Sequence, residues 1–186
     1  TSKGGKAALT KKDHQTGTDR VFEVFKNELN KEPDIIINLQ GDMPLIDPKN
    51  IKSVNLPLIN GFEIGTISTN ISENEEKNEN ITKVIIDWKK LNTLGNSVDF
   101  YKSSKRKLLN IYQHVGIYSF RPTALKKFIT LPPSKNEIEK KLEQLRALDA
   151  GIKIGITYVE NIAISVDTIE DLKIVEKIIK EKNDIN

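Results

Sequence analysis

The residues best placed to do chemistry in this sequence are polar side chains that follow an apolar run. Three isoleucines at residues 35–37 precede Asn38, Gln40 and Asp42. Such a run predicts a buried strand of a parallel sheet, and ligands of open α/β sheets bind beyond the carboxyl ends of the strands. A carboxylate held there suits a metal ion that lies against phosphates. The alternative is that Asp42 only caps the turn before Pro44.

A second candidate is the polar loop at residues 13–20, which reads DHQTGTDR. A helix from about Asp19 to Leu29 is predicted after this loop, because apolar residues recur there at helical spacing. Thr18 is the predicted N-cap of this helix. Loop donors followed by a helix N-terminus are typical of an anion or nucleotide site, and the alternative is a capped surface turn.

The predicted strand at residues 112–120 carries two further candidates, His114 and Tyr118. They are four residues apart, so a regular strand places both side chains on one face. The alternative for His114 is a hydrogen-bonded structural role. Gly116, between them, predicts a bulge or a close backbone approach.

A second aspartate, Asp167, follows another apolar stretch at residues 163–166, which is expected to be a strand. If both strands end at the same edge of the sheet, the fold brings Asp167 close to Asp42. The alternative is that Asp167 or Thr168 only caps the last helix.

Positioning these side chains requires strands and helices that alternate along the chain. Further strands are predicted at residues 7–10, 64–69, 82–87, 97–101 and 153–159, and helices from residue 47, at 121–130, at 136–149 and from 169 onward. Ser72 and Glu75 form a capping box, residues 88–96 are expected to turn, and the helix at 136–149 is expected to bury Ile138. The pattern predicts one α/β domain over residues 1–186, with a mixed, mainly parallel sheet flanked by helices.

The composition is that of an ordinary globular protein. Of 186 residues, 30% are charged and 37% hydrophobic, and 29 basic against 26 acidic residues give a net charge of +3. This balance gives no argument for nucleic acid or a membrane surface, and no apolar run approaches the roughly 20 residues of a membrane helix. The basic run at residues 102–107 is expected to be a solvated loop. The absence of cysteine suits a reducing cytosol, so a cytoplasmic location is expected.

Six segments together resemble the 3-deoxy-manno-octulosonate (KDO) cytidylyltransferases, also called CMP-KDO synthetases. Residues 13–20 resemble the family's DHxSGT[DE]R, residues 38–45 its NxQGDEPx, residues 78–84 its NPNxVKVV, residues 114–118 its HxGIY, residues 142–146 its LEQLR, and residues 166–172 its VDTPEDL. Each motif alone is weak, but six in the right order are highly specific. The resemblance runs from about Leu9 to the C-terminus and implies a fold like that of the nucleotide-diphospho-sugar transferases.

The resemblance also implies a reaction and its site residues. The anomeric hydroxyl of KDO attacks the α-phosphate of CTP, releasing pyrophosphate and forming CMP-KDO for lipopolysaccharide biosynthesis. Mg²⁺ is the implied cofactor, with Asp42 and Asp167 as its catalytic ligands. The residues at the family's nucleotide positions are Gln15, Gly17, Thr18, Gln40 and Lys83, and those at its sugar-acid positions are His114, Tyr118, Glu143 and Gln144. A homodimer is expected.

The sequence departs from the family pattern in several places. Nothing resembles the family's N-terminal [AS]RxxSxRLPGKPL loop, which grips the triphosphate, so the chain is expected to be truncated and to lack the first βαβ unit. Met43 replaces the glutamate of GDEP, Ile169 replaces the proline of VDTPEDL, and residues 100–104 keep little of the sugar-acid loop. Two alternatives follow: a catalytically impaired remnant that acts as a binding or dimerisation module, and a cytidylyltransferase for another sugar acid.

Overall fold

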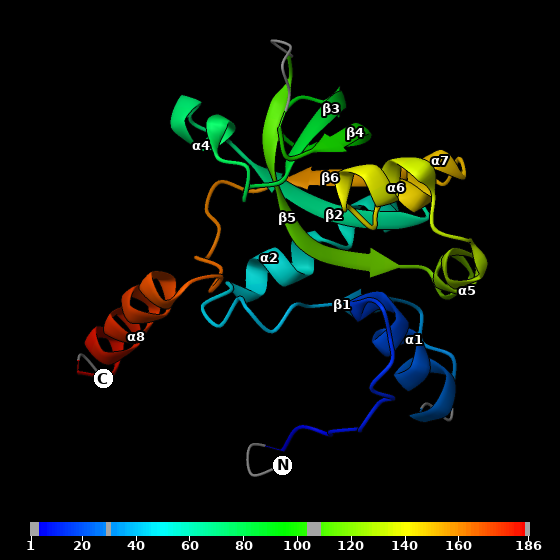
Figure 1. The fold of residues 1–186 in the computed structure, drawn as a ribbon, viewed down its shortest axis with the longest axis horizontal. Coiled ribbons are helices and arrows are strands. Elements are labelled where there is room, and N and C mark those ends of the chain that lie inside the picture. The colour runs from blue at the N-terminus through cyan, green and yellow to red at the C-terminus, as the bar shows by residue number, and fades with distance from the viewer. Residues whose placement is uncertain (1–3, 29–30, 104–108, 185–186) are drawn as a thin grey trace.

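A six-stranded sheet forms the centre of the computed structural model, which describes residues 4–28, 31–103 and 109–184 (Figure 1). The strands are β1 (Ile36–Asn38), β2 (Ile64–Thr69), β3 (Lys83–Lys90), β4 (Leu94–Tyr101), β5 (Ile111–Phe120) and β6 (Ile154–Tyr158). The helices are α1 (Gly17–Glu28), α2 (Pro48–Ser53), α3 (Leu56–Ile59), α4 (Glu73–Lys77), α5 (Pro122–Thr130), α6 (Lys135–Lys140), α7 (Leu145–Asp149) and α8 (Ile169–Asp184).

The order of the strands is β1-β5-β2-β6-β4-β3. The predicted mixed α/β sheet is confirmed, but the expectation that it is mainly parallel is wrong. Among the described pairings only β2 and β6 run parallel, whereas β5 pairs antiparallel with β1, β2 and β3, and β4 pairs antiparallel with β3 and β6. The cause is a return of the chain through β3, β4 and β5 without the helical crossovers that parallel neighbours require.

The hairpin of β3 and β4 replaces the turn predicted at residues 88–96. β3 continues to Lys90 and β4 begins at Leu94, so the turn itself is much shorter. Trp88 lies in the strand and packs edge-on against Tyr112 of β5, with ring centroids 5.1 Å apart. An aromatic side chain with such a neighbour favours a strand over a turn.

Two other predicted elements differ at the termini. The strand expected at residues 7–10 does not form, and this segment is irregular and mostly exposed. Leu29, the predicted end of the first helix, and residues 104–107 of the basic run lie outside the described residues. The last helix, α8, forms as predicted, but only Val175 of its apolar residues is fully buried, and α8 stands apart from the sheet in Figure 1.

The larger hydrophobic core lies between the sheet and helices α1, α5 and α7. Its fully buried members include Ile64 of β2, Phe100 of β4, Leu125 of α5 and Ile154 of β6. Burying each such side chain stabilises the fold by roughly 1.5–3 kcal/mol. A smaller cluster around Val54 packs against the other face of the sheet. The larger core therefore holds α1 and α7 above one sheet face.

Within the described parts of the chain, no helix combines the length and the hydropathy that crossing a bilayer demands.

Candidate active site

The loop before α1 ends in a capping box formed by Thr16 and Asp19. The hydroxyl of Thr16 accepts from the amide of Asp19 at 3.2 Å, while the carboxylate of Asp19 accepts from the amide of Thr16 at 3.1 Å. Thr16 is therefore the N-cap, and the prediction that Thr18 caps the helix is wrong. Thr18 lies inside the first turn, where its side chain is 3% exposed and faces the protein interior.

The polar residues after β1 meet this first turn. The side-chain amide of Asn38 donates to the hydroxyl of Thr18 at 3.4 Å. The side-chain amide of Gln40 in turn donates to the side-chain carbonyl of Asn38 at 3.3 Å. A Cβ placed on Gly17 would stand 3.7 Å from the oxygen of Gln40, so the helix start and Gln40 are in contact distance. Gln15 is exposed and donates to the backbone carbonyl of Asp13. The structure thus brings together Gly17, Thr18 and Gln40, three of the residues at the family's nucleotide positions.

Glu143 reaches the same place because the helix predicted at residues 136–149 is broken. Lys141 adopts a left-handed conformation, with φ 55° and ψ 47°, and ends α6. The chain turns there and continues as α7 from Leu145, so that Ile138, expected to be buried, is 65% exposed. A left-handed residue that is not glycine is costly, and tertiary contacts must supply the compensation.

A buried ion pair joins the two sides of this break. The guanidinium of Arg146 donates two parallel hydrogen bonds to the carboxylate of Glu137, at 2.8 and 2.5 Å. The same carboxylate accepts from the backbone amide of Ser134 at 3.0 Å, closing the capping box of α6. The guanidinium carbon of Arg146 also lies 4.9 Å from the ring centre of Phe128 on α5. These contacts therefore join the start of α6 to the start of α7 and to α5, on either side of residues 141–144.

The carboxyl of Glu143 is held at one oxygen and unpaired at the other. Its Oε2 accepts from the hydroxyl of Thr18 at 2.9 Å, whereas its buried Oε1 has no hydrogen-bond partner within the described residues. Burial raises the pKa of Glu143 above its ordinary value, against the hydroxyls of Thr16 and Thr18 and the charge of Arg146, which lower it. An unpaired buried oxygen is costly in a free protein, and such groups are typical of binding sites.

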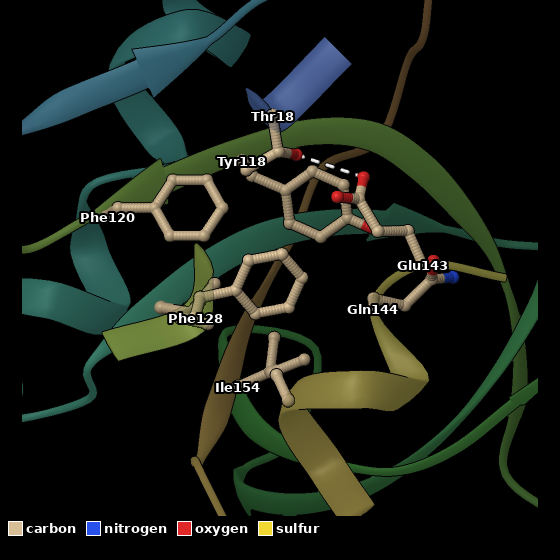
Figure 2. A pocket seen from close by; sticks show the side chains of 9 residues that line it. Thr18, Tyr118, Phe120, Phe128, Glu143, Gln144 and Ile154 are labelled. Atoms are coloured by element: carbon tan, nitrogen blue, oxygen red, sulfur yellow. Dashed lines mark hydrogen bonds between the residues drawn. The ribbon is translucent and has the colours of Figure 1, made fainter. Parts of the chain in front are cut away.

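These residues line a small cavity that is open to solvent. Figure 2 shows Thr18 and Glu143 at one side, with Gln144 beside them and the rings of Tyr118, Phe120 and Phe128 around the space. Burial raises the pKa of Tyr118 well above its ordinary value, and the neighbouring Glu143 raises it further. The cavity therefore combines an apolar floor with a few polar groups at its rim, which is typical of small-molecule sites.

His114 lies behind this cavity rather than in its lining. Its ring centroid is 5.4 Å from that of Tyr118, which confirms that both side chains share one face of β5. The imidazole Nε2 is 3.0 Å from the hydroxyl of Thr66, and burial lowers the pKa of His114 to about 3. The ring is therefore neutral and supports Tyr118 from behind. The register of β5 against β2 shifts on either side of Gly116, so the predicted bulge is confirmed.

Asp42 and Asp167 lie on neighbouring segments, although the strand predicted at residues 163–166 does not form. The stretch before Asp167 is irregular, and the amide of Val166 donates to the backbone carbonyl of Asp42 at 2.8 Å. The hydroxyl of Thr168 accepts from the amide of Asp171, so Thr168 caps α8 and the carboxylate of Asp167 is not the cap. Oδ1 of Asp42 is buried and has no hydrogen-bond partner within the described chain.

Lys83 lies apart from the cavity, at the start of β3. Its side chain is completely buried, and its ammonium donates to the backbone carbonyls of Asn78 and Lys102 at 2.5 and 2.6 Å. Burial lowers the pKa of Lys83, which the nearby carboxylates Glu76 and Glu79 oppose. Its role at phosphates stays a prediction, and the contacts that the structure gives it are structural.

Sequence reasoning missed two residues that organise the site. Asn38 was noted as a polar residue but given no role, and Arg146 was only part of a motif. Asn38 is the last residue of β1, and Gln40 follows two positions later, where its side chain reaches back to that of Asn38. Arg146 is nine positions after Glu137, a spacing that one continuous helix would not have brought into contact.

Comparisons with known proteins give the family. A family model described as cytidylyltransferase matches residues 1–154. The 3-deoxy-manno-octulosonate cytidylyltransferase of Chelativorans sp. is 37% identical over 179 residues, which cover 92% of this chain and 71% of that protein. The enzyme of the same name from Brucella ovis is 38% identical over 173 residues, which cover 91% of this chain and 69% of that protein.

A solved structure of CMP:2-keto-3-deoxy-manno-octonic acid synthetase complexed with CTP matches with a TM-score of 0.85 and 32% identity, over 97% of this chain and 75% of that one. The inositol-1-phosphate CTP transferase of T. maritima, 20% identical with a TM-score of 0.52, covers 83% of this chain and 59% of that one and shares the fold alone. The extent of these matches and the order of the six motifs agree, and the chain belongs to the family of 3-deoxy-manno-octulosonate cytidylyltransferases.

Proposed function

We propose that this protein transfers the cytidylyl group of CTP to the anomeric hydroxyl of KDO, forming CMP-KDO and releasing pyrophosphate. The observation that carries the proposal is the match of 97% of the chain, at a TM-score of 0.85, to a CMP-KDO synthetase solved with CTP. The product would serve lipopolysaccharide biosynthesis, and the reaction would take place in the cytoplasm.

In this proposal the nucleotide binds where the loop before α1 meets the end of β1. The oxygen of the Gln40 side chain is an acceptor of the kind that the exocyclic amine of cytosine requires. Gly17 has no side chain to cover that oxygen, and Gln15 lies exposed two residues earlier. The N-terminus of α1 favours a nearby negative charge. Thr18 contributes to nucleotide binding indirectly, because its hydroxyl contacts Glu143 at the sugar-acid site.

The sugar acid binds in the cavity between β5 and α7. Oε1 of Glu143 is free to accept a hydrogen bond from a sugar hydroxyl, and Gln144 and Tyr118 line the same space. Burial raises the pKa of Glu143 and so favours its neutral form more than water does, and this form would donate a hydrogen bond to a sugar oxygen. His114 acts from behind by holding the ring of Tyr118 in place.

Asp42 and Asp167 are the proposed ligands of Mg²⁺. The buried, unpaired Oδ1 of Asp42 fits such an ion, because it needs a positive partner, and carboxylate oxygens are the ligands that Mg²⁺ prefers. When held by these carboxylates, such an ion would supply positive charge against the negative charge that develops on the phosphates. The chain's own contribution is to hold both aspartates on segments joined by the bond from Val166 to Asp42.

The test is to incubate the protein with CTP, KDO and Mg²⁺ and to follow the release of pyrophosphate. Release that depends on all three components is the expected result. Release with a nine-carbon sugar acid but not with KDO would instead favour a cytidylyltransferase for another sugar acid. If pyrophosphate is not released and calorimetry detects no binding of CTP with Mg²⁺, the proposed activity is wrong for this chain, and the binding-module alternative takes its place.

We also propose that the protein assembles as a homodimer. Large apolar side chains on α8 are exposed, including Ile169 at 68% and Ile174 at 48%. Apolar surface of this kind gains free energy when a partner covers it. Sedimentation equilibrium measures the mass directly, and a mass of one chain at micromolar concentration would contradict the proposal.

A further inference from the structure

We propose that Asn38 is a positioning residue that couples nucleotide binding to sugar-acid binding, through a hydrogen-bond chain that runs from Gln40 to Glu143. The inference rests on the proposed function, because it assigns CTP to one end of the chain and KDO to the other. Beyond that function, the inference is that the two sites are coupled through one buried group, the side-chain amide of Asn38.

The chain consists of three hydrogen bonds that all point the same way. Gln40 donates to the carbonyl of Asn38 at 3.3 Å, Asn38 donates to the hydroxyl of Thr18 at 3.4 Å, and Thr18 donates to Oε2 of Glu143 at 2.9 Å. The members come from the end of β1, the first turn of α1 and the turn between α6 and α7. Three elements that are distant in sequence therefore share one line of polar groups.

The middle of the chain is sealed from solvent. Asn38 is 4% exposed and Thr18 is 3% exposed, so water cannot easily replace a missing partner of either side chain. Asn38 must accept from Gln40 and donate to Thr18 at once, and a side-chain amide offers both functions on one planar group. Aspartate at position 38 would lack the donor, and leucine would lack both functions.

The hydrogen-bond chain is held more weakly at its Gln40 end than at its Glu143 end. Gln40 is half-buried, and the bonds at 3.3 and 3.4 Å are longer than the usual 2.9–3.0 Å for such pairs. A nucleotide that contacts Gln40 orders this side chain, and bonds that are long in a free enzyme tighten in its complex. Hydrogen bonds in a row polarise one another, so the Thr18 hydroxyl is fixed more firmly on Oε2 of Glu143.

Fixing Oε2 leaves Oε1 of Glu143 in one position for the sugar acid. The first ligand to bind then loses the conformational entropy of ordering the hydrogen-bond chain, and the second ligand binds to a site that is already ordered. CTP and KDO should therefore bind with positive coupling, and the coupling should depend on Asn38.

The first experiment needs no substrate. The side-chain carboxyl of Glu143 is followed by carbon-13 NMR across pH in the wild type, in Asn38→Leu and in Thr18→Val. We expect the pKa of Glu143 to be higher in Asn38→Leu than in the wild type, because the hydroxyl of Thr18 is no longer fixed as its donor. The groups that face Glu143 from other elements, Thr16, Asp19, Tyr118 and Arg146, are the same in all three proteins. An unchanged pKa in Asn38→Leu overturns the proposal.

The second experiment measures the coupling itself. KDO is titrated calorimetrically with and without a CTP analogue whose α–β bridging oxygen is a methylene group, so that no pyrophosphate is released. We expect the wild type to bind KDO at least about fivefold tighter when the analogue is present, and Asn38→Leu to bring this ratio close to one. Thr18→Ser, which keeps the hydroxyl, should retain the coupling.

The matched control is Ser119→Ala, which removes a buried hydrogen bond of 2.6 Å to Val54 on the opposite face of β5. A ratio that Asn38→Leu leaves unchanged, or that Ser119→Ala lowers equally, overturns the proposal. So does a wild type that binds both ligands independently. A wild type that binds neither ligand contradicts the proposed function instead, and the NMR titration then still decides whether the chain orders Glu143.

Discussion

The backbone amide of Val166 donates a hydrogen bond of 2.8 Å to the carbonyl oxygen of Asp42. This bond joins the loop after β1 to the segment before α8, so Asp167 follows directly after a fixed point. Thr168 caps α8, which frees the carboxylate of Asp167 from that task. A single backbone contact between two irregular segments thus joins the regions that carry Asp42 and Asp167, the proposed metal ligands.

The first prediction concerns these aspartates. Asp42→Asn and Asp167→Asn should each lower the rate of pyrophosphate release by at least about 100-fold, because a neutral amide binds Mg²⁺ much less well than a carboxylate. The measurement is kcat at saturating CTP and KDO. Asp47→Asn is the control, since Asp47 caps α2 through its side chain and asparagine caps equally well. Full activity of either site variant would contradict the assignment.

The second prediction concerns the pH dependence of stability. The pKa of Glu143 is raised in the folded protein, so the folded state binds more protons than the unfolded state between the two pKa values. The free energy of unfolding therefore falls as the pH rises through that interval. Glu143→Gln removes the buried charge, so its melting temperature should exceed that of the wild type at pH 8, with a smaller difference at pH 4.

The control for this titration is Glu176→Gln, because Glu176 is exposed on α8 and buries no charge. The difference between wild type and Glu143→Gln should depend on pH, whereas that for the control should not. A constant difference across pH would show that Glu143 titrates alike in both states.

The third prediction concerns the ion pair of Arg146 and Glu137. Arg146→Met should lower the free energy of unfolding by about 3–5 kcal/mol, because it leaves the carboxylate of Glu137 buried without its partner. Urea unfolding measures the loss, and the double variant Arg146→Met/Glu137→Met should recover much of it. Lys135→Met, which breaks only an exposed contact of 3.8 Å to Glu139 on the same helix, should cost less than about 0.5 kcal/mol. Equal losses in both single variants would contradict this account.

The fourth prediction separates two roles of Lys83. Its hydrogen bonds to Asn78 and Lys102 predict that Lys83→Met lowers stability by about 1–3 kcal/mol, because two backbone carbonyls lose their partner. A role at the triphosphate predicts instead a raised KM for CTP with unchanged stability. Denaturant unfolding and steady-state kinetics on one preparation distinguish them. Lys90→Met, at an exposed position of the same strand, is the control.

Local signals in the sequence were sufficient for much of the fold. The predicted strand at residues 64–69 coincides with β2, and the capping box of Ser72 with Glu75 forms as expected. Both depend on side-chain period or on contacts three residues apart, which neighbouring residues determine. The same holds for the helix that begins at Pro48 and for the bulge at Gly116.

Tertiary contacts decided what local pattern could not. Residues 136–149 have a helical apolar period, yet α6 ends at a left-handed Lys141, and the buried pair of Arg146 and Glu137 joins the two shorter helices. The sequence of residues 88–96 predicts a turn, but in the fold Trp88 packs against Tyr112 of β5 and lies in a strand. In both cases a contact between distant residues outweighs propensities that are worth less than about 1 kcal/mol per residue.

The sequence by itself determined which side chains are available at the site, through the order of its motifs and the polar residues after β1. Only the tertiary structure decided that Thr18 faces Glu143 rather than capping its helix, and that Asp42 meets the segment before Asp167 through an irregular loop. The physical reason is that a hydrogen bond between buried groups selects one arrangement among many that the local sequence allows, since leaving either partner unpaired costs about 1–3 kcal/mol.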